Sequence, residues 1–470
     1  MNIKSISFYL SLFCFPVSFL AFINILYSSY FDYFLSIESY FITLIVSLIF
    51  GFGFYLFGKK SSKNINFFEQ LILIILVYFI ISILISIPFY LSNFQVTFLS
   101  AIFESVSGLT GTGFSTIKNI KYLDPTLILW RSSSQWIGGL FFLIFLIILF
   151  SNKSFNFKMT NLTFIGDSEF KSEENVKNNV IKIFIFYILL SILFLSLLNF
   201  SGVRLFNSLN LTMSLVSGGG FLPSNNLNEI ISTNLQKFVL IISLVISMLN
   251  FYILFNIFDR KVLLRDHKED FYLLSLAVVF ILLIYFNNFD GLNIIISVIS
   301  SLSNSGITLI QTENNLSLYF LLLTIVGGSI ISNTSGIKLS RFYILLKITS
   351  LEIIKLISPN SVINKTIFNS QNKITNDNIR ISFLIFISFF ISLIILSSFL
   401  VFDNIGFERS FKLAVLALTN TVNSEMYNIQ NINFANLLIS SKISLIIFMI
   451  IGKIELISVF LIIKKIFFKD

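Results

Sequence analysis

Glycine and hydroxyl residues gather in residues 104–117 (ESVSGLTGTGFSTI), a composition that could bind a monovalent cation. The stretch holds three glycines and six serines or threonines, and it lies between two long apolar runs. Irregular backbone at membrane depth must be enclosed by protein or line water, because each N–H or C=O group left unpaired in lipid costs several kcal/mol. Glycines let the backbone turn carbonyl oxygens toward an axis, and threonine hydroxyls add further ligands. A ring of such oxygens can replace the hydration shell of a cation.

Three further stretches have the same place in the chain and indicate a fourfold internal repeat. They begin at Ser217, Ser303 and Asn420; each follows a short apolar run and lies roughly a hundred residues after the last. One such stretch alone would be an ordinary loop between helices, whereas four in matched positions favour a repeated pore element. The candidate cation ligands are Thr110, Gly111, Thr112, Gly113, Ser217, Gly218, Gly219, Gly220, Ser303, Asn304, Ser305, Gly306, Asn420, Thr421, Val422 and Asn423.

The composition indicates an integral membrane protein. Of the 470 residues, 56% are hydrophobic and 12% are charged, and the mean hydropathy is +0.90. A soluble domain carries about a quarter charged residues. One cysteine (Cys14) and one histidine (His267) exclude a disulfide framework and argue against a zinc or haem site. The sequence has no glycine-rich loop of the Walker type, which argues against direct ATP-driven pumping.

The apolar runs predict an all-α protein of about ten spans and four shorter half-helices. A half-helix of about eight to twelve residues is too short to span a membrane and is typical of a re-entrant segment. The predicted spans are 6–27, 40–57, 68–91, 127–150, 180–198, 235–258, 271–286, 318–347, 381–402 and 434–467. The predicted half-helices are 96–107, 206–216, 292–302 and 411–418.

These elements group into an N-terminal hairpin and four pseudo-repeats of helix, pore helix, filter and helix around one pore. The hairpin is 1–63, and the repeats are 64–158, 159–265, 266–357 and 358–470. The first apolar run ends without a small-residue cleavage site, so it is expected to be a span rather than a cleaved signal. With ten spans, all the basic clusters fall on one side of the membrane, as the positive-inside rule requires. Both termini are then cytoplasmic, and the net charge of +9 reflects topology rather than nucleic-acid binding.

Four motifs together resemble the Trk/Ktr/HKT superfamily of potassium transporters, most closely its TrkH-like branch. The motifs are WRSSSQWIGG at 130–139, SGLTGTG at 107–113, GGSIISNTSGIKLSR at 327–341 and GKIE at 452–455. The resemblance implies one filter segment per repeat, a gate in a broken helix of the third repeat, and potassium as the transported ion with no bound cofactor. It also implies a homodimer in the lipid membrane and a cytosolic nucleotide-binding regulatory subunit.

The resemblance maps the characteristic filter glycine of the family onto Gly113, Gly220 and Gly306, and onto Asn423 in the fourth repeat. Asparagine tolerates left-handed backbone better than other non-glycine residues, so the carbonyl ring could persist, or the side chain could enter the pore. The second filter also lacks a threonine. Selectivity for potassium over sodium is therefore left open.

The gate implied by the resemblance comprises Gly327, Gly328, Ser332, Asn333, Thr334, Ser335, Gly336 and Lys453. Lys453 is a cation inside an apolar span, and such charges usually face the interior of a helix bundle. We expect it to contact the carbonyls of the broken-helix loop. For Lys453 the alternative is a structural ion pair with Glu455, which a spacing of two residues disfavours. For the loop the alternative is a simple kink stabilised by hydroxyl groups.

Three charged residues flank the predicted filters. Glu104 and Glu425 could concentrate cations at the outer mouth, and Arg131 begins the following span. Alternatively these charges are solvated or paired for structural reasons.

The sequence thus predicts potassium uptake across a prokaryotic inner membrane. The membrane potential would supply about 2.3 kcal/mol per charge per 100 mV. Alternatives are a sodium-permeable or coupled symporter of the same fold, and a conduction-deficient membrane protein. An enzyme is not expected, because a convergent catalytic set is hard to assemble from one histidine and one cysteine.

Overall fold

Helices make up the computed structural model. It describes residues 2–61, 65–94, 96–150, 173–251, 268–285, 291–309, 316–358, 366–369, 374–429, 432–454 and 465. Within these ranges the regular structure consists of α-helices and short 3₁₀ turns, with no β-strand. The predicted all-α class is therefore confirmed. Short 3₁₀ turns are Phe34–Ser36, Ile120–Tyr122, Leu227–Glu229, Ile367–Asn369, Glu425–Tyr427 and Phe434–Asn436.

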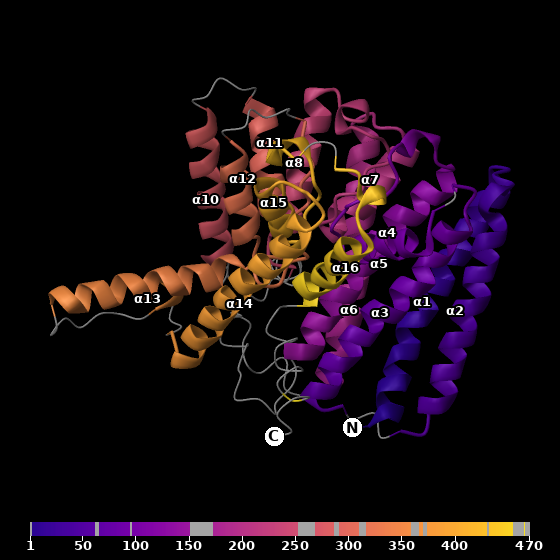
Figure 1. The fold of residues 1–470 in the computed structure, drawn as a ribbon, viewed down its shortest axis with the longest axis horizontal. Coiled ribbons are helices and arrows are strands. Elements are labelled where there is room, and N and C mark those ends of the chain that lie inside the picture. The colour runs from indigo at the N-terminus through magenta and orange to yellow at the C-terminus, as the bar shows by residue number, and fades with distance from the viewer. Residues whose placement is uncertain are drawn as a thin grey trace.

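Six helices in the described part of the chain are long and apolar enough to cross a membrane. Figure 1 shows the first five of them side by side along one flank, from the N-terminus onward. Each of the six corresponds to one of the predicted apolar spans. The six are α1 (Ile3–Tyr30), α2 (Ile37–Gly58), α3 (Phe67–Leu91), α5 (Pro125–Phe150), α6 (Glu173–Phe200) and α14 (Asn376–Val401).

Four short helices occupy the places of the predicted half-helices, and each differs from its predicted bounds by four residues at most. They are α4 (Phe98–Thr110), α7 (Leu205–Ser217), α11 (Gly291–Leu302) and α15 (Phe407–Leu418). The remaining described helices are α8 (Asn234–Met248), α10 (Lys268–Tyr285), α12 (Ser317–Val326), α13 (Leu339–Ile357) and α16 (Ile439–Ile454).

The predicted span 318–347 is broken into two helices, as the resemblance implied for the third repeat. α12 ends at Val326 and α13 begins at Leu339, and the residues between them form an irregular stretch, here called the α12–α13 loop (327–338). The predicted span 235–258 is interrupted as well, because α8 ends at Met248 and Leu249 has extended backbone. The last residues of the predicted spans 235–258 and 434–467 lie outside the described residues. The count of ten spans stays a prediction.

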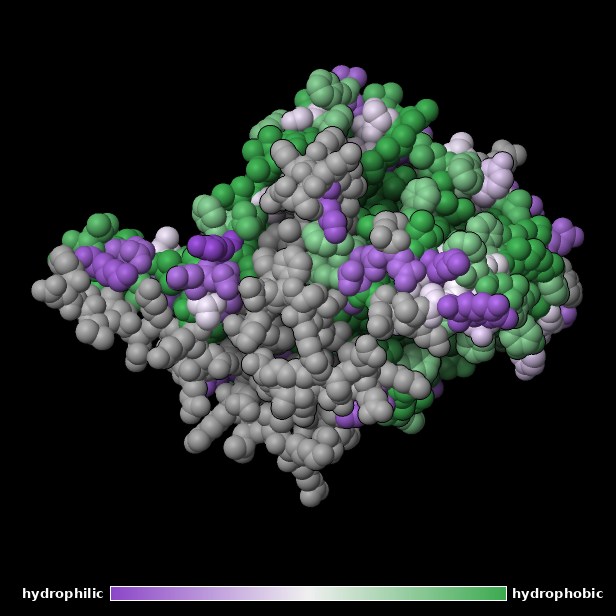
Figure 2. Space-filling model, turned by 90° about the horizontal axis from the view of Figure 1, so that it is seen from below, coloured by the Kyte–Doolittle hydropathy of each residue, from purple (hydrophilic) through white to green (hydrophobic). Residues whose placement is uncertain are grey.

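The distribution of polar side chains is the reverse of that in a soluble protein. Large apolar residues such as Phe19, Leu189 and Ile394 are more than half exposed, whereas most of the hydroxyl groups at the ends of the short helices are buried. Viewed from below in Figure 2, hydrophobic residues cover the flanks of the coloured surface. Such a surface suits contact with lipid tails, with polar groups satisfied inside.

One helix stands apart from the rest. α13 projects away from the body of the molecule (Figure 1) and carries hydrophilic and hydrophobic residues side by side (Figure 2). Its exposed apolar residues include Leu346, Ile353 and Ile354.

Candidate cation site at the ends of four short helices

Within two residues of the end of each of the four short helices lies a residue in the left-handed region, and Gly113 and Gly306 also have positive φ angles, of 81° and 70°. The φ angles are 81° at Gly111, 68° at Gly218, 57° at Asn304 and 49° at Asn420. Glycine has no Cβ to clash there, and asparagine is the side-chain-bearing residue that tolerates it best. This shared residue sets the register of four segments, named in chain order segment 1 (110–113), segment 2 (217–220), segment 3 (303–306) and segment 4 (419–422).

Side-chain hydrogen bonds agree with this register. In three segments the hydroxyl before the left-handed residue contacts the hydroxyl after it. The oxygen–oxygen distances are 2.7 Å for Thr110–Thr112, 3.0 Å for Ser303–Ser305 and 3.0 Å for Thr419–Thr421. Segment 2 has Gly219 at the second of these places and so lacks the pair.

The register corrects the predicted correspondence in the fourth repeat. The sequence matched Asn423 to Gly113, but the structure places Val422 there, two residues after the left-handed Asn420. Both asparagines are plausible glycine substitutes by residue type, and only the backbone shows which of them adopts the left-handed conformation. Thr419 therefore belongs to the segment, and Asn423 follows it.

Two asparagine side chains join segment 4 to its neighbours. The Asn304 amide donates to the Thr421 hydroxyl at 3.2 Å and to the Thr324 carbonyl oxygen at 3.0 Å. The Asn420 amide donates to the Thr112 hydroxyl at 3.0 Å and to the Met449 carbonyl oxygen at 2.8 Å. Segment 4 thus contacts segment 3 on one side and segment 1 on the other.

Glycines mark the close contacts that complete the ring. A Cβ atom added to Gly111 would lie 3.7 Å from Gly219 Cα, and one added to Gly220 would lie 2.6 Å from the Ser305 carbonyl oxygen. Segment 1 therefore lies against segment 2, and segment 2 against segment 3. All four predicted stretches meet at one place.

The Val422 side chain lies where the other three segments have glycine. A Cβ added to Gly113 would be 3.0 Å from Val422 Cβ, one added to Gly220 would be 2.5 Å from it, and one added to Gly306 would be 3.0 Å from Val422 Cγ1. At this position segments 1, 2 and 3 thus present bare backbone, and segment 4 presents an apolar side chain.

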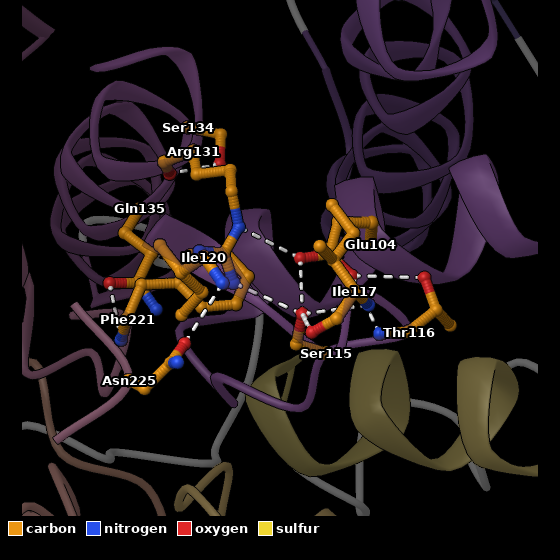
Figure 3. Close-up of polar contacts among 10 residues, drawn as sticks. All are labelled: Glu104, Ser115, Thr116, Ile117, Ile120, Arg131, Ser134, Gln135, Phe221 and Asn225. Atoms are coloured by element: carbon orange, nitrogen blue, oxygen red, sulfur yellow. Dashed lines mark hydrogen bonds and ion pairs between the residues drawn. The ribbon is translucent and has the colours of Figure 1, made fainter. Parts of the chain in front are cut away.

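Gln135 of α5 completes segment 2, a role that the sequence did not reveal. Its side-chain oxygen accepts a hydrogen bond from the Phe221 amide at 3.2 Å, as Figure 3 shows. A Cβ on Gly219 would overlap this side chain. Gln135 lies in the WRSSSQWIGG motif, and that motif was the feature of the sequence that could have pointed to it.

Glu104 and Arg131 form a buried ion pair rather than an outer-mouth charge. The Arg131 Nε lies 2.9 Å from Glu104 Oε1, and each side chain is 1% exposed. Glu104 also accepts hydrogen bonds from the Ser115 hydroxyl and the Thr116 amide, both at 2.9 Å (Figure 3). The guanidinium stacks 4.1 Å from the centroid of the Phe221 ring. The structural alternative therefore holds for this pair, which fixes the chain beyond segment 1. Glu425 lies half-buried in the 3₁₀ turn Glu425–Tyr427.

The α12–α13 loop touches three of the four segments directly. The Asn333 amide donates to the Val216 carbonyl oxygen at 2.7 Å, just before segment 2, and the Ser335 hydroxyl donates to Asn420 Oδ1 at 2.8 Å. A Cβ on Gly327 would lie 3.3 Å from Asn304 Oδ1. The loop thus lies against the ring of segments.

Lys453 of α16 links the loop to segment 1. Its ammonium donates to the Asn333 carbonyl oxygen at 2.9 Å and would lie 3.9 Å from a Cβ on Gly111. The side chain is 3% exposed, and the ammonium lies 4.6 Å from the centroid of the Phe142 ring. Glu455, the other partner considered, lies outside the described residues.

The loop is held by its own hydrogen bonds. Gly327 and Gly336 have φ angles of 67° and 84°. The Gly328 amide donates to the Thr334 hydroxyl at 3.1 Å, and that hydroxyl lies 2.7 Å from the Ser332 hydroxyl. The predicted gate residues of the loop are therefore gathered in one compact turn that is buried except at Gly336, and Lys453 reaches it from α16.

The arrangement offers neutral oxygen atoms and few charges. Within the described ranges no three His, Cys, Asp or Glu side chains are grouped to hold a metal ion. Carbonyl and hydroxyl oxygens suit a weakly bound alkali cation rather than a transition metal.

Comparisons with known proteins place the chain among cation transporters. The sequence model of the TrkH family, described as a cation transport protein, matches residues 36–316. An uncharacterized cation transporter of Methanocaldococcus jannaschii is 28% identical over 91% of this chain and 89% of its own. The potassium uptake protein TrkG of Escherichia coli is 25% identical over 93% and 92%.

The fold matches a solved structure over nearly its whole length. The crystal structure of the potassium transporter TrkH from Vibrio parahaemolyticus superimposes with a TM-score of 0.87 over 98% of both chains, at 16% sequence identity.

Proposed function

The chain belongs to the TrkH family of cation transport proteins, and from this premise we propose that it carries potassium into the cell through the ring of segments 1 to 4. The family consists of membrane transporters, not enzymes. Its relatives named as Trk potassium uptake proteins support potassium as the cargo.

One observation carries the proposal: four stretches from distant parts of the chain meet in a closed ring of contacts. The Asn304–Thr421 and Asn420–Thr112 hydrogen bonds close two of its sides, and glycine contacts close the others. A ring of backbone and hydroxyl oxygens can take the place of water around a dehydrated cation. No cofactor is needed for this step.

The pore is proposed to arise from four pseudo-repeats within ten spans, in a bacterial inner membrane with both termini cytoplasmic. The second helices of two repeats support this symmetry. Gly138 of α5 packs against the Leu109 carbonyl, and Gly452 of α16 packs against the Leu418 carbonyl. Leu109 and Leu418 have equal places, each directly before segment 1 or segment 4.

The α12–α13 loop is proposed as the gate, with Lys453 as a fixed positive charge beside it. The loop lies against the end of the ring, and the Lys453 ammonium donates to the Asn333 carbonyl oxygen. A cation leaving the ring would meet both, so the loop must move before the ion can pass.

The partners are proposed to be a second copy of this chain and a cytosolic nucleotide-binding regulatory subunit. The projecting helix α13, whose exposed apolar residues lie apart from the body, supports the homodimer. The regulatory subunit follows from the family resemblance alone.

Val422 favours a second candidate, a pore that conducts weakly or passes sodium. Its side chain occupies space that glycine leaves open in the other segments. An apolar group there supplies no ligand oxygen and narrows the ring.

Rescue of a potassium-uptake-deficient bacterium in low-potassium medium tests the function. Wild type should restore growth, and Gly113→Asp, which crowds the ring, should not. Immunoblots of membranes would verify equal amounts of both proteins. Equal growth with both would contradict transport through the ring. Rubidium-86 and sodium-22 uptake into vesicles would separate the potassium-selective from the sodium-permeable candidate.

A further inference from the structure

Lys338 ends the α12–α13 loop in an unusual backbone conformation. Its φ angle is 75°, in the left-handed region, and its side chain is 3% exposed. A residue with a Cβ is strained there and keeps the conformation only where surrounding contacts impose it. Here the contacts of the Lys338 side chain impose the conformation.

The Lys338 ammonium lies inside a cage of oxygen atoms from its own loop. It lies 2.8 Å from Thr334 Oγ1, 3.2 Å from the Ser329 carbonyl oxygen, 3.3 Å from Ser332 Oγ and 3.5 Å from the Ser332 carbonyl oxygen. It also contacts the Thr334 carbonyl oxygen. An ammonium has three hydrogens, fewer than these five acceptors. Carbonyl and hydroxyl oxygens arranged around one point are the ligands that hold an alkali cation.

Carboxyl groups of α10 lie against the same cage. Glu269 lies near Lys338, and Asp270 lies near Ser329. Asp270 also accepts a hydrogen bond from the Asn250 amide at 3.0 Å. Both side chains are less than 5% exposed, and Arg341, in the first turn of α13, is buried as well. The oxygen cage is therefore built into the core and is not a surface feature.

We propose that the oxygens of Ser329, Ser332 and Thr334, with Glu269 beside them, form a monovalent-cation site that the Lys338 ammonium occupies as a tethered ion. An ammonium group is close to a potassium ion in size and charge, and here it is part of the chain. The tethered cation joins both halves of the loop and holds it in its closed form. This last step rests on the proposed role of the loop as the gate, whereas the site itself does not.

Removing the tether should open the site to a free cation. Purified Lys338→Met should bind one more rubidium ion per chain than wild type in equilibrium rubidium-86 binding. Rubidium should also raise its thermal unfolding midpoint more than that of wild type, whereas choline at equal ionic strength should not. Lys412→Met is the matched control, because Lys412 is a buried lysine paired with Glu408 on α15. Equal rubidium stoichiometry in Lys338→Met, Lys412→Met and wild type would overturn the site.

A second variant covers the case in which Lys338→Met does not fold. Ser332→Ala keeps the ammonium and removes one hydroxyl from the cage. It should raise rubidium-86 flux into vesicles about tenfold, as expected for loss of one hydrogen bond to a charged group. Unchanged flux would overturn the closing role. If wild type carries no cation at all, the proposed transport fails, but rubidium binding still decides whether the site exists.

Discussion

A buried carboxylate and guanidinium hold the chain that leaves segment 1. Glu104 accepts hydrogen bonds from Ser115 and Thr116 as well as from Arg131, so one carboxylate organises three partners. Removing one partner of such a buried pair is strongly destabilising, because the remaining charge is then buried without compensation.

Glu104→Gln should therefore lower the free energy of unfolding by about 3–5 kcal/mol. The thermal unfolding midpoint in detergent would measure it. Glu229→Gln is the control, because Glu229 pairs with Lys121 at the surface, where the side chains are 33% and 56% exposed. That pair should contribute about 0–1 kcal/mol. Equal losses in both variants would contradict the structural role of the buried pair.

Val422→Gly should increase rubidium-86 flux and lower the sodium-to-rubidium flux ratio. The reason is that glycine restores bare backbone at the one level where segment 4 differs from segments 1 to 3. Val422→Ala should give an intermediate value. Flux ratios that stay the same across the series would show that this side chain does not shape the ring.

Residue types predicted these sites only in part. Glycine and hydroxyl content revealed the four stretches. The register of segment 4, however, depended on whether Asn420 or Asn423 adopts the left-handed backbone conformation. Likewise, Glu104 and Arg131 are 27 positions apart, so only folding reveals that they pair. Gln135 was missed because an amide gives no charge or spacing signal.

At the scale of elements, two glycines allow a helix to approach the end of a neighbouring short helix. A Cβ on Gly138 would overlap the Leu109 carbonyl oxygen, and a Cβ on Gly452 would overlap the Leu418 carbonyl oxygen. These are backbone atoms, which cannot rotate away as a flexible side chain can. α5 and α16 therefore set the positions of segments 1 and 4.

Gly138→Ala and Gly452→Ala should each reduce rubidium-86 uptake and lower the unfolding midpoint, because the helices must separate. Gly53→Ala in α2 is the control, since nothing lies within 4 Å of its added Cβ. It should be tolerated, or stabilise the helix by about 0.5–1 kcal/mol. Harm from Gly53→Ala equal to that of the other two would contradict the packing argument.

The boundaries of the short helices were predictable because an apolar run too short to span must end within the membrane. The broken helix was also visible, since glycines and hydroxyl residues interrupt the run between Val326 and Leu339. The direction of α13 was not predictable. Its composition continues the run, whereas its path away from the body depends on packing that periodicity does not encode.

For the whole molecule, α13 gives the proposed homodimer a testable contact. The protein has one cysteine, Cys14, which is fully buried, so an added surface cysteine can be crosslinked selectively. Ile353→Cys on α13 should form crosslinked dimers in native membranes. Leu189→Cys, equally exposed but on α6 of the body, should not. Equal crosslinking at both positions would contradict a dimer made through α13.

The overall class could be predicted because lipid demands apolar surfaces and satisfied backbone. The meeting of four distant segments could only be expected by analogy among repeats. Contacts such as Asn420 to Thr112, 308 positions apart, arise from tertiary packing alone.

The α12–α13 loop is hydrogen-bonded to Val216, just before segment 2, and to Asn420 of segment 4, so ion occupancy and loop conformation are thermodynamically linked. If a bound ion shifts the balance between two loop conformations, the same coupling free energy must alter ion affinity when the loop is shifted by any other means. A regulator acting on α13 could then tune how tightly the ring holds its ion without touching it.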